Sequence, residues 1–171
     1  HSLPVCPQPL TLVGLAVQCL HLPLEFPGLG LHGLLFLGIP ADLILGNNVF
    51  AHAPDINDFV AGIQALLDVD GWAILEFPYA VDMLQKVEFD TIYHEHYSYL
   101  NVMSLIPIFA KHGLRIFNVE ELDTHGGSLR IFVCRTKSHW KEDASVKNCI
   151  YEEGVHDPRS DNVALKAQSR S

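Results

Sequence analysis

The chain of 171 residues has a mass of 19.0 kDa, which fits one domain of ordinary size. Hydrophobic residues make up 49% and charged residues 18%, enough apolar material to exclude intrinsic disorder over the whole chain. With 11 Lys and Arg against 20 Asp and Glu, the formal charge is −9, so we expect no nucleic acid or anionic membrane partner. The four cysteines form no CxxC pair and predict no disulfide framework, which favours a reduced, cytoplasmic setting.

The first forty residues differ in composition from the rest of the chain. Residues 1–40 hold no Lys or Arg, one acid, twelve leucines and six of the ten prolines, whereas residues 41–171 hold 11 basic and 19 acidic residues, a net of −8. The prolines interrupt every apolar run before it reaches the roughly 20 residues of a membrane-spanning helix. We therefore expect residues 1–40 to be an irregular segment that is not native to the following domain, through a frameshift, misassembly or truncation.

A regular pattern follows this segment. The apolar run 41–46 is typical of a buried parallel strand. Asp55 is a good N-cap for an amphipathic helix over 56–67, whose apolar residues recur at helical spacing. A second apolar strand over 72–77 ends before Pro78. Strand, helix and strand with short links predict a right-handed βαβ unit and hence a parallel sheet.

The later pattern predicts a helix and a closing hairpin. Ser104 is the expected N-cap of this helix, with Pro107 still in its first turn. Residues 114–119 and 129–135 are expected strands around a Gly-rich turn, and they give the parallel sheet an antiparallel edge. The fold class is therefore α/β. The remaining expected elements are a helix over 143–153 and a disordered tail over 157–171.

Chemically active side chains concentrate in two segments, each of which follows a predicted strand. Residues 90–99 combine two histidines, two carboxylates and three tyrosines, and residues 47–52 contain Asn48 and His52. In open α/β sheets, functional groups collect in the loops beyond the carboxyl ends of the strands. We therefore expect His52 and His96 to lie in one crevice.

The composition of residues 90–99 also allows two other interpretations. His94, Glu95 and His96 are a candidate metal site, but ligands two residues apart require a strand, and no third ligand is near in sequence. We therefore expect no metal here. The tyrosines are also candidates for simple packing, and we expect Tyr97 and Tyr99 to pack on the core.

Four motifs between residue 41 and about residue 155 resemble a known family, and they stand in the correct order. They read ADLILGNNVFAHAPDINDFV, GWAILEFPY, FDTIYHEHYSYL and KHGLRIFNVEELDTHGGSLRIFVC. They are similar to the S-adenosylmethionine-dependent sugar C-methyltransferases, which methylate a ring carbon of nucleotide-linked deoxy-keto-sugars. The resemblance implies a partial Rossmann-like methyltransferase sheet over residues 41–156. It also implies S-adenosyl-L-methionine as the cofactor and a nucleotide sugar as the small-molecule partner.

The resemblance also implies roles for individual residues. His96 is the candidate general base, which removes an acidic C–H proton beside a ketone, and Glu95 orients or polarises the local network. Tyr93 is expected to donate a hydrogen bond to the developing enolate oxygen. His52 stands where the family has a second histidine and is expected to relay protons. Asn48 is expected to shape the floor between cofactor and sugar.

Residues 1–40 depart from the family pattern. Family members carry an N-terminal zinc-binding region with paired cysteines, a Gly-rich turn after the first strand that holds the cofactor, and an acidic residue after the second strand. None of these is found in residues 1–40. The chain is therefore expected to be a fragment of a C-methyltransferase, and its own activity is left open. The alternatives are a catalytically inactive remnant that binds nucleotide sugar weakly, and a His/Glu metallohydrolase.

Overall fold

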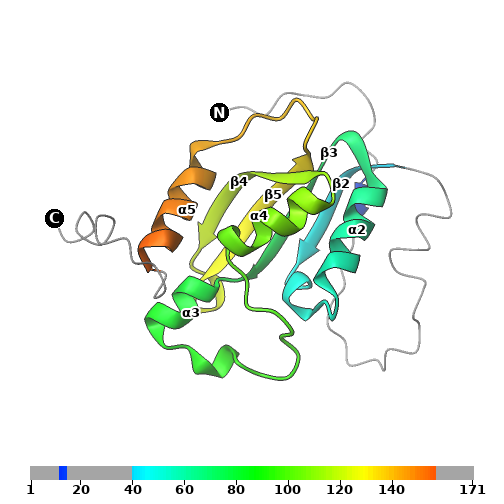
Figure 1. The fold of residues 1–171 in the computed structure, drawn as a ribbon. Coiled ribbons are helices and arrows are strands. Elements are labelled where there is room, and N and C mark those ends of the chain that lie inside the picture. Colours follow the sequence, from blue (N-terminus) through cyan, green and yellow to red (C-terminus); the bar gives the residue numbers. More distant parts are fainter. Residues whose placement is uncertain (1–11, 15–39, 157–171) are drawn as a thin grey trace.

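The structure, a computed structural model, describes residues 12–14 and 40–156 (Figure 1). Its strands are β1 (Leu12–Gly14), β2 (Ala41–Asn47), β3 (Leu67–Pro78), β4 (Leu114–Leu122) and β5 (Ser128–Arg135). Its helices are α2 (Ile56–Leu66), α3 (Ala80–Lys86), α4 (Val102–Lys111) and α5 (Ala144–His156), with short 3-10 turns η1 (Phe50–His52), η2 (Phe89–Thr91) and η3 (Thr124–Gly126). In these described ranges, no helix has both the length and the apolar character needed to cross a membrane.

The strands form one five-stranded sheet in the order β1-β2-β3-β5-β4. β1, β2 and β3 run parallel, whereas β5 is antiparallel to both β3 and β4. The α/β class, the parallel βαβ unit and the antiparallel edge hairpin expected from the sequence are thus confirmed. Helices α2 and α4 lie in front of the sheet in Figure 1, and α5 lies beside β4.

β1 is the part of residues 1–39 that the structure describes. Leu12 to Gly14 pair in parallel with residues 43–45 of β2. These three residues therefore depart from the irregular structure expected over residues 1–40, because an extended segment satisfies backbone groups along the edge of β2. The rest of that range, except Pro40, and the expected tail over 157–171 lie outside the described residues.

β3 begins earlier than the apolar pattern predicts. The expected turn before Trp72 belongs to the strand, which starts at Leu67 and shifts register against β2 between Ala41 and Leu43. Gly71 is needed at this irregularity because a Cβ atom there would lie 2.5 Å from the Ala41 carbonyl oxygen. Such a close backbone approach is one reason for glycine inside a strand.

The helix caps confirm one expectation and correct another. Asp55 caps α2, and its carboxylate accepts hydrogen bonds from the Asn57 and Asp58 backbone N–H groups at 2.9 and 3.1 Å. The expected cap Ser104 is instead the third residue of α4, where it forms a capping box with the actual N-cap, Asn101. Pro107 consequently lies inside the helix rather than in its first turn. Asn and Ser are equally good caps, so the local sequence does not rank them.

The core between the sheet and its helices holds the beginning of the functional loops in place. Phe50 in η1 is fully buried, and its ring centroid lies 5.8 Å from Phe77 in β3 and 6.0 Å from Phe109 in α4. The burial of an aromatic side chain contributes about 1.5–3 kcal/mol. η1, which ends at His52, is therefore fixed against the carboxyl end of the sheet.

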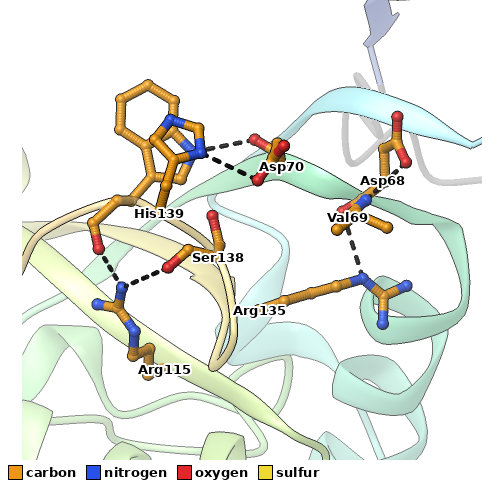
Figure 2. A network of polar contacts seen from close by, with 8 residues as sticks. Asp68, Val69, Asp70, Arg115, Arg135, Ser138 and His139 are labelled. Atoms are coloured by element: carbon orange, nitrogen blue, oxygen red, sulfur yellow. Dashed lines mark hydrogen bonds and ion pairs between the residues drawn. The ribbon is translucent and has the colours of Figure 1, made fainter.

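The amino end of β3 is closed by a polar network (Figure 2). The Arg135 guanidinium donates to the main-chain carbonyls of Gln64 at 2.7 Å and Leu67 at 2.6 Å, where α2 ends. Nearby, the Asp70 carboxylate binds His139 Nδ1 at 2.9 Å. These bonds occupy the end of β3 opposite to the one where the histidines of the predicted site lie.

Candidate active site

The site lies where β2 and β3 end in parallel. After Asn47 the chain turns at Asn48, whose φ of 54° is in the left-handed region that asparagine tolerates better than most residues. The Asn48 backbone N–H donates to the Glu76 carbonyl oxygen at 2.8 Å, which ties the turn to the end of β3. His52 follows at the end of η1, so its position is set by both strands.

The second part of the site is the segment 87–100, named here the histidine loop, which contains Tyr93, Glu95 and His96. It begins after α3 at Val87, whose φ of 56° turns the chain away from the helix. It ends at Leu100, which pairs with Tyr79 in an isolated parallel bridge.

Hydrogen bonds attach the histidine loop to η1. The Tyr97 and Ser98 backbone N–H groups both donate to the Ala51 carbonyl oxygen, at 2.9 and 3.2 Å. His52 Nδ1 is 2.8 Å from the Glu95 carbonyl oxygen. As a result, the ring centroids of His52 and His96 lie 4.8 Å apart. The structure thus brings together the two histidines that the sequence analysis expected to meet.

The hydrogen bonds of the two imidazoles define their tautomers. His96 Nδ1 is 2.8 Å from the Thr91 carbonyl oxygen, so both Nδ1 atoms face a main-chain carbonyl. Because a carbonyl oxygen only accepts, each Nδ1 carries the hydrogen and donates. In a neutral imidazole of this form, Nε2 holds the lone pair. Both rings are therefore arranged to accept a proton at Nε2.

Of the other predicted residues, Tyr93 lies beside the His96 ring, whereas the Glu95 side chain is directed towards His94. The Tyr93 ring centroid is 4.4 Å from that of His96, and the Tyr93 side chain is exposed. The Glu95 carboxylate lies 3.9 Å from His94 Nε2, whereas its main-chain carbonyl receives the His52 hydrogen bond. Glu95 thus orients His52 through its backbone.

Tyr97 and Tyr99 do not pack on the core, contrary to the sequence-based expectation. They are 62% and 42% exposed. The histidine loop has little regular structure, so no strand or helix period assigns its side chains to an inner or outer face. The Tyr99 ring instead lies nearly perpendicular to that of His96, with 6.2 Å between the ring centroids.

The candidate metal site on the histidine loop finds no support. In residues 12–14 and 40–156, no three His, Cys, Asp or Glu side chains are grouped so that they could hold a metal ion. The His94 side chain is 89% exposed, so it has few protein neighbours.

Sequence analysis missed an ion-pair network at the end of β3. The Arg130 guanidinium binds Glu76 at 3.0 Å and Glu120 at 3.2 Å, and its hydrogen bond to the mostly buried Glu76 raises the pKa of Arg130. A carboxylate in the apolar strand 72–77 was the available signal, because a charge in a buried strand is normally paired. The network holds β3, β5 and β4 together next to the Asn48 turn.

Sequence analysis also missed a buried cluster between β3 and α5, formed by Tyr79, Cys149 and Glu153. The Tyr79 hydroxyl lies 3.7 Å from Cys149 Sγ, which is 3.6 Å from Glu153 Oε1. Burial raises the pKa of Cys149 to about 12 and raises the pKa values of Tyr79 and Glu153. A pocket of about 450 Å³ borders this cluster, and its polar lining includes Asp82 and Glu152.

Comparison with known proteins identifies a relative. No protein-family model matches the chain. Over 122 residues, or 71% of the chain, the sequence is 40% identical to the C-methyltransferase NovU of Streptomyces niveus. The chain is a relative of a C-methyltransferase. The matched stretch is 28% of the NovU length, so the chain spans less than a third of that protein. The resemblance stated from the sequence motifs is thus confirmed.

Solved methyltransferase structures resemble the fold at lower similarity. The magnesium protoporphyrin IX methyltransferase ChlM from Synechocystis PCC 6803 with bound SAH is 18% identical, with a TM-score of 0.45. That match covers 60% of this chain and 48% of ChlM. The N-methyltransferase NodS from Bradyrhizobium japonicum WM9 is 12% identical, with a TM-score of 0.42, and the match covers 57% and 52% of the two chains. Likenesses this low assign no ligand and no residue role here.

Proposed function

We propose that residues 40–156 form the proton-abstracting part of an S-adenosylmethionine-dependent C-methyltransferase that acts on a nucleotide-linked deoxy-keto-sugar. The observation that carries the proposal is the His52–His96 pair, whose rings lie 4.8 Å apart with both Nδ1 atoms bound to carbonyls. Methylation of a carbon beside a ketone requires a base, and imidazole is a common one near neutral pH. The relationship to a C-methyltransferase supports the same chemistry.

The proposed reaction begins with proton transfer from substrate to protein. His96 Nε2 takes the proton from the carbon beside the ketone, the C–H bonding electrons form a C=C bond, and the π electrons of the C=O bond move to the oxygen to give an enolate. Tyr93, whose ring is 4.4 Å from that of His96, donates its phenolic hydrogen bond to that oxygen. Hydrogen-bond donors placed at developing negative charge are typically a large part of such catalysis.

His52 and Glu95 have supporting roles in this proposal. Once His96 holds the proton, a neutral His52 beside it avoids the repulsion between two cations and is a ready acceptor for onward transfer. The Glu95 carbonyl keeps His52 Nδ1 protonated by accepting its hydrogen bond at 2.8 Å. Glu95 therefore helps to keep Nε2 of His52 as the acceptor, although its carboxylate faces His94.

The described residues supply only a small part of a cofactor site. S-adenosyl-L-methionine supplies an electrophilic methyl group to the enolate carbon. The Asn48 turn at the carboxyl end of β2 is in the right region of an α/β sheet for a cofactor or its neighbouring substrate. Within the described residues, however, no Gly-rich turn connects a strand to a helix. The described residues therefore do not make a complete cofactor site.

A hydrogen-exchange experiment on the substrate tests the proposal. Residues 40–156 replace the matching stretch of NovU, and the chimera is incubated in D₂O with a panel of nucleotide-linked deoxy-keto-sugars but without cofactor. Mass spectrometry should show deuterium at the carbon beside the ketone, because the base acts before methyl transfer. If a chimera that binds the sugar incorporates no deuterium above the buffer rate, the proposed function is wrong.

The alternatives are separated on the 171-residue chain itself. Isothermal titration with S-adenosylmethionine and metal analysis of the purified protein distinguish three outcomes. Micromolar cofactor affinity favours the methyltransferase, and one equivalent of metal favours the hydrolase. Neither cofactor nor metal binding favours the inactive remnant, for which the incomplete cofactor site is the supporting observation. We expect no methyl transfer by the 171-residue chain alone.

A further inference from the structure

The two ends of segment 79–100, which contains α3 and the histidine loop, lie side by side. The chain leaves β3 at Tyr79 and returns at Leu100, and the Ala80 backbone N–H donates to the Leu100 carbonyl oxygen at 3.1 Å. All of α3 and the histidine loop lies between these points. Whatever holds Tyr79 and the start of α4 therefore determines where both ends of segment 79–100 are placed.

One buried side chain from α5 binds the start of α4. The Glu153 carboxylate accepts hydrogen bonds from the Val102 and Met103 backbone N–H groups at 2.6 and 2.7 Å. These are the first two residues of the helix, whose N–H groups have no partner within it. Asn101 accepts from the third, Ser104, at 3.0 Å. Residues on two elements thus satisfy the first turn of α4 completely.

The same side chain is linked through Cys149 to Tyr79, at the other end of segment 79–100. A carboxylate only accepts hydrogen bonds, so the Cys149 thiol donates to Glu153 Oε1 at 3.6 Å. Cys149 Sγ is then the acceptor for the Tyr79 hydroxyl at 3.7 Å. The chain Tyr79–Cys149–Glu153 connects the end of β3 to the start of α4 through the interior.

The carboxyl group of Glu153 is buried, and no basic side chain in the described part of the chain is bonded to it. The residue is only 2% exposed, and in the described part of the chain it has no bond to a lysine, arginine or histidine side chain. The nearby titratable groups are the protonated Tyr79 and Cys149. The partial positive charge at the N-terminus of α4 is therefore the main compensation for a buried carboxylate.

We propose that Glu153 is a positioning residue for the His52–His96 pair. By holding the N-terminus of α4 directly and Tyr79 through Cys149, it fixes both ends of segment 79–100, while η1 binds the histidine loop within this segment through the Ala51 carbonyl. The catalytic consequence rests on the proposed function. The structural part is independent of it and is testable without activity.

The test uses the 171-residue chain and two isosteric variants on the same helix. Glu153→Gln places an amide nitrogen against one of the two α4 N–H groups, and Glu152→Gln is the matched control, because Glu152 is exposed and has no part in the cluster. Amide hydrogen exchange is followed at Tyr97 and Ser98, which donate to Ala51, and at Ile131 in the central strand β5. The ¹⁵N shifts of His52 and His96 report their tautomers.

Glu153→Gln should accelerate exchange at Tyr97 and Ser98 by about tenfold or more, since one lost buried hydrogen bond to a charged group corresponds to about that factor. The imidazole ¹⁵N shifts should move towards a mixture of tautomers, whereas Ile131 and the Glu152→Gln protein stay as in the parent. Unchanged loop amides and imidazoles overturn the proposal. Equal acceleration at Ile131 also overturns it, because that result describes a loss of global stability.

A second variant serves if Glu153→Gln does not fold. Cys149→Val removes the link to Tyr79 but leaves the carboxylate on α4, so we expect a smaller acceleration at the same loop amides. If the Glu153→Gln protein is unfolded and Cys149→Val leaves the exchange rates of these amides unchanged, the positioning role of Glu153 is overturned. The outcome is distinct from failure of the proposed function, which shows only in the deuterium incorporation of the chimera.

Discussion

The imidazole rings of His52 and His96 lie 4.8 Å apart, although the residues come from different loops after different strands. Each ring donates its Nδ1 hydrogen to a main-chain carbonyl of the histidine loop, from Glu95 and Thr91 respectively. The backbone of this loop therefore determines the tautomer of both rings. A substitution that moves the loop is therefore expected to change the tautomers without touching an imidazole.

Replacing His96 tests its assignment as the base. In the NovU chimera, His96→Gln should lower methyl transfer about 10²–10⁴-fold, the usual cost of losing general-base catalysis. Cofactor affinity should stay nearly unchanged, because His96 acts on the sugar. The measurements are S-adenosylhomocysteine formation and isothermal titration of the cofactor. His139→Gln, at the opposite end of the sheet, is the histidine control and should keep the parent rate; full activity of His96→Gln contradicts the assignment.

Replacing Tyr93 separates the hydrogen-bond donor from the base. Tyr93→Phe keeps the ring that lies 4.4 Å from His96 but removes the phenolic hydroxyl. We expect a loss of turnover in the chimera that is smaller than for His96→Gln, because the base remains while one donor to the enolate is lost. Steady-state rates under saturating sugar are the measurement. A Tyr93→Phe loss as large as that of His96→Gln is inconsistent with these separate roles.

The buried carboxyl of Glu153 predicts a pH-dependent stability. Burial raises the pKa of Glu153 above its ordinary value of 4.5, so the folded protein binds the proton more tightly than the unfolded chain. The stability contributed by protonated Glu153 is therefore fully present at a pH below the pKa of Glu153 in the unfolded chain. It is lost as the pH rises through the pKa of Glu153 in the folded protein. Urea unfolding at pH 4 and pH 7 should show the parent losing stability relative to Glu153→Gln as the pH rises. An equal difference at both pH values contradicts the raised pKa.

The buried thiols predict protection from alkylation. Burial raises the pKa of Cys149 to about 12, so at pH 8 only about one molecule in ten thousand carries the thiolate. The pKa of Cys134 is raised by burial as well. Native protein treated with iodoacetamide should therefore stay unmodified at both residues by peptide mass spectrometry, and protein in urea should react. Rapid native labelling of Cys149 is the contrary result.

Arg135 predicts a stability effect far from the candidate site. Its guanidinium caps the end of α2 by donating to the Gln64 and Leu67 carbonyls, and it also donates to the Asp68 carbonyl in the network of Figure 2. Arg135→Met should lower the free energy of unfolding by about 1.5–3 kcal/mol, the usual range for hydrogen bonds to a charged group. Urea denaturation is the measurement. Lys137→Met, in the exposed turn after β5, should change it by less than about 0.5 kcal/mol.

Local patterns were enough to predict most of the secondary structure. β2, α2 and the hairpin of β4 and β5 follow from strand and helix periods, and Asp55 was recognised as a cap from its own side chain. The predicted start of β3 was wrong, because the actual start depends on how Gly71 approaches the Ala41 carbonyl of the neighbouring strand. The cap of α4 was also misassigned. Asn101 and Ser104 are equivalent by type, and the helix start is favoured by Glu153, which is distant in sequence.

The sequence by itself determined that His52 and His96 would share one end of the sheet, because parallel strands bring their carboxyl ends to the same edge. Only the tertiary structure decided the distance between their rings, the Nδ1 hydrogen bonds that select their tautomers and the exposure of Tyr97. It also decided the link from Glu153 to the start of α4. These features are contacts between segments far apart in the chain, and such contacts form only when packing of the sheet and helices brings the segments together.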